Sequence, residues 1–177
     1  MKKAGAFLIL VVLAGTCGFA VHSQNTTTVT VGDVVHTLTV GSSTQNGIHL
    51  SLTDSFSPPG LPLSDISITA NVNDAKALRS LVLRFEASSG FVPSGEIAFV
   101  FAGGKTASLY CLPVARPSKG GGSAYQLTFL SDLGALCRLG ATAEGATVEL
   151  NIYSKKNSIA KLVLPKAFFE FLSPQAR

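Results

Sequence analysis

The stretch TVTVGDVVHTLTV, residues 28–40, decides the fold class of this chain. Apolar residues alternate with small polar residues on both sides of Gly32-Asp33. That alternation is typical of strands with one buried face, and glycine accepts the positive φ of a tight turn. The sequence therefore predicts a β-hairpin here.

The same two-residue alternation continues along the chain, with one helix as an exception. It returns in five further segments: residues 48–53, 66–72, 81–86, 125–130 and 148–153. Turn signals separate them: the proline-rich crossover at 55–62, Gly103-Gly104, and residues 155–158. Ser131-Asp132 is expected to cap a short helix over 133–139 that ends at Gly140.

This pattern predicts an all-β fold. We expect a β-sandwich, immunoglobulin-like or jelly-roll-like, of about 8–10 short strands with one short helix. Residues 24–177 are predicted to form a single β-rich domain after a signal peptide over residues 1–23.

Composition agrees with an exported β-protein. Hydrophobic residues make up 46% of the chain and charged residues 14%, which excludes an intrinsically disordered protein. The formal net charge of +4 falls to +2 when Lys2 and Lys3 are removed. A balance this close to neutral predicts no nucleic-acid partner and no strong attraction to a membrane surface.

The N-terminal residues resemble a bacterial signal peptide. Lys2 and Lys3 precede the apolar run FLILVVLA at 7–14, and small residues follow it. Cleavage is expected after Ala20 or after Ser23, which would place the protein in the periplasm or the secreted fraction.

Two other N-terminal interpretations are weaker. Gly15, Thr16 and Gly18 interrupt the apolar run, which disfavours a membrane-spanning anchor. The residues before Cys17 resemble a lipoprotein signal, but Ala14 and Thr16 replace its large aliphatic residue and its small residue. Lipidation of Cys17 is therefore a minority alternative.

Export would leave Cys111 and Cys137 in an oxidising compartment, where an even pair predicts a disulfide bond. Such a bond would stabilise the fold by roughly 3.6 kcal/mol on the chain-entropy model. The alternative is two thiols that only pack in the core. The sequence has no Cys-x-x-Cys pair or Cys/His cluster, so neither thiol redox catalysis nor structural zinc is expected.

No motif in the sequence assigns a catalytic, cofactor-binding or metal-binding residue. Residues 103–106, GGKT, resemble the end of a phosphate-binding loop, but Phe99 replaces its first glycine and a hairpin turn is the better interpretation. The sequence also has no Gly-x-Ser-x-Gly elbow to expose a nucleophilic serine.

Histidines and aspartates give only weak candidates for a site. Strand parity places His36 on an apolar face and His49 on a polar face, and two histidines alone make a poor metal site. Asp54 and Asp65 flank the crossover; a glycosidase-type carboxylate pair is conceivable, but ordinary turn residues are favoured.

Two concentrations of positive charge are the remaining candidates for binding a partner. They comprise Arg116, Lys119, Lys155 and Lys156. If both lie at one end of a sandwich, they would suit an acidic envelope protein or polymer.

The leading hypothesis is an exported, non-catalytic β-domain of the envelope or secreted fraction with a structural, adhesive or ligand-binding role. The alternatives are a small exported hydrolase, and an accessory protein or inhibitor that docks through an edge strand or the loop at 113–123.

Overall fold

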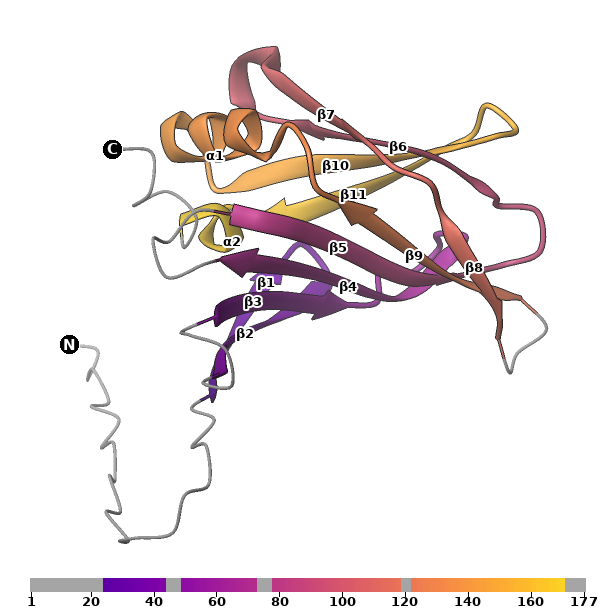
Figure 1. Cartoon of the computed structure of the whole chain (residues 1–177), viewed down its shortest axis with the longest axis horizontal. Helices are drawn as coiled ribbons and strands as arrows, with labels where there is room; N and C mark the ends of the chain where they lie inside the picture. The colour runs from indigo at the N-terminus through magenta and orange to yellow at the C-terminus, as the bar shows by residue number, and fades with distance from the viewer. Residues whose placement is uncertain (1–23, 44–48, 73–77, 119–121, 171–177) are drawn as a thin grey trace, which may run out of the picture.

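The computed structural model describes residues 24–43, 49–72, 78–118 and 122–170 (Figure 1). Two antiparallel sheets make up most of this part of the chain. The predicted signal peptide lies outside the described residues.

The larger sheet has seven strands in the order β1-β2-β3-β4-β5-β9-β8. Their bounds are β1 Gln24–Val31, β2 Val34–Ser43, β3 His49–Phe56, β4 Leu63–Val72, β5 Leu78–Ala87, β9 Ser123–Phe129 and β8 Val114–Pro117. The predicted first hairpin is confirmed, because Val31 pairs with Val34 across Gly32, whose φ is 58°.

The smaller sheet has four strands in the order β11-β10-β6-β7. Their bounds are β11 Ile159–Pro165, β10 Thr147–Ser154, β6 Pro93–Val100 and β7 Thr106–Tyr110. The GGKT motif lies at the predicted turn between β6 and β7: its glycines end the short helical turn η1 (Ala102–Gly104), and Thr106 begins β7. Gly103 and Gly104 both have positive φ there.

The two sheets bury their facing sides against each other. Along β4, β5, β6 and β10 alternate residues are buried, as the predicted periodicity requires. Phe99 and Phe169 lie in edge-to-face contact, with ring centroids 5.6 Å apart. Burial of each such ring contributes about 1.5–3 kcal/mol to the free energy of unfolding.

Two helices lie at one end of the sheets (Figure 1). They are α1 (Leu133–Thr142) and α2 (Ala167–Glu170), and α2 inserts Phe168 and Phe169 into the core. The first helix begins at Leu133 as predicted, but its predicted cap and its predicted end are wrong. Asp132 is left-handed, with a φ of 60°, and its side chain makes no cap, while Gly140 lies inside α1. A Cβ on Gly140 would lie 3.1 Å from the Cβ of Phe169, so the glycine permits close packing of α1 on α2.

The all-β sandwich is confirmed at this level, but its strand order differs from the expected families. Strands β1 to β5 form a five-strand meander. Immunoglobulin-like and jelly-roll folds instead use Greek-key connections. The described residues also form eleven strands, more than predicted, because the loop expected at 113–123 contains β8.

Candidate functional site

The outward side of the larger sheet is covered by hydroxyl side chains. Cross-strand register joins Thr26, Thr39, Thr53 and Thr69 in one row across β1 to β4. A parallel row contains Thr28, Thr37, Ser55 and Ser67. With Ser51 these residues are called the hydroxyl face below.

The hydroxyl face is accessible and partly ordered by its own hydrogen bonds. Thr26, Thr28 and Ser55 are exposed, and the other members are half-buried. The Oγ1 atoms of Thr53 and Thr69 lie 3.0 Å apart, and those of Thr26 and Thr39 lie 3.3 Å apart. The cross-strand bonds fix hydroxyl orientation while leaving lone pairs for a ligand.

The outward side of the smaller sheet has a different chemistry. Glu96 pairs with Tyr110 across β6 and β7. On β10 and β11, Lys161 Nζ lies 3.6 Å from Glu149 Oε1 in a diagonal ion pair. The hydroxyl of Tyr110, which is 61% exposed, donates to Glu96 Oε1 at 3.2 Å. Charged and aromatic groups are therefore concentrated on this side of the sandwich.

A histidine–aspartate pair lies inside the sandwich. His36 on β2 and Asp54 on β3 are both 0% exposed, and His36 Nδ1 lies 2.9 Å from Asp54 Oδ2. When Asp54 is ionised, the ring nitrogen is the donor, because a carboxylate only accepts. Phe56 covers the imidazole, with ring centroids 4.3 Å apart.

The environment of this pair opposes charge. Burial raises the pKa of the Asp54 carboxyl above its ordinary value of 3.8, and the hydrogen bond and charge of His36 offset part of the rise. Within the described ranges, His36 Nε2 and Asp54 Oδ1 have no hydrogen-bond partner. A catalytic triad would need a nucleophile at Nε2, so this geometry does not supply one.

The structure does not bring together the other weak candidates. The carboxylate-pair alternative is wrong, because Asp54 faces the core while Asp65 is exposed in a bulge of β4 with a φ of 48°. His36 and His49 lie toward opposite ends of the β2–β3 ladder, where Ser43 pairs with His49 and Thr37 with Ser55. In the described part of the chain, no group of three or more His, Cys, Asp or Glu residues is placed to hold a metal ion.

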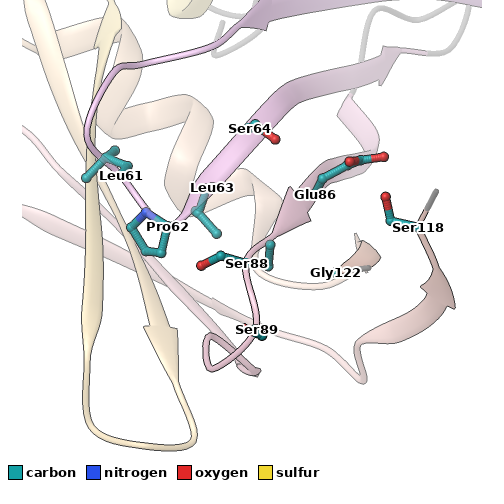
Figure 2. A pocket seen from close by; sticks show the side chains of 10 residues that line it. Leu61, Pro62, Leu63, Ser64, Glu86, Ser88, Ser89, Ser118 and Gly122 are labelled. Carbon is teal, nitrogen blue, oxygen red and sulfur yellow. The ribbon is translucent and has the colours of Figure 1, made fainter. Parts of the chain in front are cut away.

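A pocket of about 390 Å³ lies between the crossover before β4, the end of β5 and the β8–β9 turn (Figure 2). Glu86 and several serines, including Ser88 and Ser118, line it. Figure 2 shows the Glu86 carboxylate and the Ser118 hydroxyl on the same side of the pocket. Among the described residues that line this pocket, Glu86 is the single ionisable group.

Of the predicted cationic residues that the structure describes, Arg116 lines a different surface from Lys155 and Lys156. Arg116 is exposed on β8 and lines a pocket of about 340 Å³ with Arg84, Asp65 and Glu86. Lys155 and Lys156 are exposed in the β10–β11 turn of the other sheet and do not line that pocket. Lys119 lies outside the described residues. Both hairpins point toward the same end of the molecule (Figure 1), but carboxylates accompany the arginines.

The predicted disulfide bond is absent from the structure: Cys111 and Cys137 are both free and half-buried. The backbone separates the two thiols. Cys111 follows the far end of β7, whereas α1 lies at the end where β7 begins (Figure 1). Burial raises the pKa of both thiols, so neither is activated as a nucleophile.

Comparison with known proteins gives no relative: no family model, curated protein or solved structure matches this chain. The described residues contain no helix with the length and hydropathy needed to cross a membrane.

Sequence reasoning placed His36 on an apolar face but missed its partner Asp54 and the hydroxyl face, although strand parity could have revealed both. Leu50 and Leu52 mark the inward side of β3. Asp54, two residues after Leu52, lies on the same side of the strand. His36 has the same relation to Leu38 on β2. The complementary positions on these strands are mostly Thr or Ser, and this was the available signal for the hydroxyl face.

Proposed function

We propose that the chain is an exported, non-catalytic β-domain that binds a component of the cell envelope or secreted matrix through the hydroxyl face. The observation that carries the proposal is the pair of hydroxyl rows across four neighbouring strands. Rows of donors and acceptors on a rigid sheet are preorganised, so ordering them on binding costs little conformational entropy.

The remaining polar features favour binding over catalysis. The buried His36–Asp54 pair is closed to solvent, and the described residues that line the pocket in Figure 2 include one ionisable group, the Glu86 carboxylate. Export is supported by the N-terminal resemblance to signal peptides. The uncharged rows favour hydrogen bonding over attraction between charges as the source of affinity.

Co-sedimentation with isolated insoluble envelopes of the producing cells tests this function. We expect the wild-type protein to sediment with them and Thr53→Lys to bind at least about tenfold more weakly, because a lysine would disrupt the centre of the face. Thr106→Lys is the matched control, since it adds the same charge at an exposed position on β7.

Equal sedimentation of wild type and Thr53→Lys, or no sedimentation of the wild type, would contradict the proposal. Mass spectrometry of the recovered protein tests export separately. The mature N-terminus is expected between Cys17 and Gln24, and a chain that still begins at Met1 would contradict cleavage of the signal.

A further inference from the structure

We infer that the ligand of the hydroxyl face is a neutral polysaccharide lying across strands β1 to β4. This inference rests on the proposed binding role of the face and specifies the chemistry of its ligand.

The charge of the face selects against ionic polymers. Within residues 24–30, 35–41, 51–55 and 67–71, the outward positions contain no Asp, Glu, Lys or Arg. The exposed carboxylate of Asp65, earlier on β4, lies at the border of the face, where it lines a pocket with Ser55 and Ser67. An acidic polymer would need cations, and the nearest in the two rows is Arg84, opposite Ser67. Arg84 Nε already donates to Gln126 Oε1 at 3.0 Å.

The pocket next to Arg84 does not extend a cationic track. Arg84 and Arg116 share its lining with Asp65 and Glu86, so positive and negative side chains are mixed. A polyanion would meet repulsion as well as attraction there. A neutral chain has no comparable penalty.

The spacing of the rows suits a polymer with repeated hydroxyl groups. Neighbouring strands lie about 4.8 Å apart, so the row from Thr26 to Thr69 spans about 14 Å. Sugar rings linked in an extended chain present hydroxyls along both edges at intervals of similar size. Such a chain can exchange hydrogen bonds with one strand after another, directly or through water.

The lack of aromatic side chains in these rows determines how binding should behave. Individual hydrogen bonds made in exchange for water contribute little, so affinity must accumulate over several strands. We therefore expect long chains to bind more tightly than short oligosaccharides. Binding should also resist salt, because the rows have no charges to screen.

The opposite side of the sandwich offers a contrasting mode of sugar binding. Tyr110 presents an exposed ring beside Glu96, where stacking would dominate recognition. Variants on the two sides of the sandwich can therefore compare binding by hydroxyl groups with binding by an aromatic ring.

Calorimetry and affinity electrophoresis with soluble polysaccharides test the inference. The neutral probes are hydroxyethylcellulose and dextran, and polygalacturonate is the acidic probe. We expect at least one neutral probe to bind, with affinity unchanged between about 0.1 M and about 1 M salt, and polygalacturonate not to bind.

The decisive variant is the triple substitution Thr39→Val, Thr53→Val and Thr69→Val. Valine keeps the branched shape and the strand preference of threonine but removes the hydroxyl. Binding should fall at least about tenfold, whereas Thr106→Val and Tyr110→Ser should bind as wild type. Circular dichroism and thermal melting establish that each variant is folded, and single Thr39→Ala and Thr53→Ala variants serve if the triple variant does not fold.

The possible outcomes distinguish an error in the assigned ligand from an error in the assigned binding face. If neither neutral probe binds, or if polygalacturonate binds in a salt-sensitive way, the assignment of a neutral polysaccharide is wrong. If, in that case, the triple variant sediments with isolated envelopes less than the wild type does, the proposed binding face is still supported. If Tyr110→Ser abolishes binding while the triple variant retains it, both the hydroxyl face and this inference are wrong.

Discussion

His36 and Asp54 require an explanation at the scale of single residues, because both are fully buried in a largely apolar interior. Their hydrogen bond offsets part of the cost of burial, while the unpartnered atoms of the pair leave a remaining cost of about 1–3 kcal/mol each. The pair therefore does little for net stability, but removal of one partner leaves the other buried and unsatisfied. Its protonation should be visible in the stability of the whole protein.

Replacing Asp54 with Asn tests this coupling. The pKa of Asp54 is raised in the folded protein, so the folded state holds its proton more tightly than the unfolded chain. The contribution of Asp54 to stability is then fully present below pH 3.8 and is lost as the pH rises through the raised pKa. Relative to Asp54→Asn, the wild type should lose up to about 1.4 kcal/mol per pH unit in this window.

Denaturant unfolding of both proteins across this pH range measures the difference. Asp33→Asn, an exposed substitution in the β1–β2 turn, controls for the change in net charge. Parallel curves for wild type and Asp54→Asn would show that the Asp54 pKa is not raised by folding.

At the scale of strands and helices, the alternation of residues predicted most of what forms. The first hairpin, the proline-rich crossover before β4 and the turn between β10 and β11 all lie where the turn residues place them. Local sequence specifies such features because glycine, proline and asparagine restrict or permit particular backbone angles.

Features that depend on distant segments were missed. Strand β8 follows Pro113, ends at Pro117 and forms by pairing with β9. Its own residues therefore give little strand signal. Those prolines also remove backbone donors, which makes β8 a poor edge for docking another strand and weakens the accessory-protein alternative. Alternating Thr and Ser residues marked the outward side of each strand, but their alignment into rows depends on the register of β1 to β4, which the sequence does not specify.

Substitution of Gly95 tests how β6 packs against the segment that follows β7. Its φ is 97°, and a Cβ there would overlap the carbonyl oxygen of Cys111, whose amide donates to Gly95 O at 2.9 Å. Gly95→Ala should destabilise the protein by at least about 2 kcal/mol, because strain and overlap act together. Gly60→Ala, with a φ of 74° and open space around the Cβ, should cost only about 1–2 kcal/mol.

Thermal and urea unfolding compare the two glycine variants. An equal loss of stability in both would mean that Cys111 does not approach Gly95 as closely as described. The strand β6 would then join the segment after β7 in a different way.

At the scale of the whole molecule, the sandwich places two unlike surfaces on opposite sides of one core. The larger sheet presents neutral hydroxyl rows, and the smaller sheet presents Glu96, Tyr110 and Lys161. Neither sheet is large enough to be stable alone, because each must bury its apolar side against the other. Packing of the two sheets thus holds the hydroxyl face rigid.

The most direct test of this account is a chemical-shift map of the isotope-labelled protein titrated with a neutral polysaccharide. The threonine methyl and amide signals of Thr39, Thr53 and Thr69 should move together, with smaller changes fading toward β9 and none at Tyr110. Perturbations centred on Tyr110 and Glu96, or on the pocket lined by Glu86 and Ser118, would contradict the claim that the hydroxyl face is the binding surface.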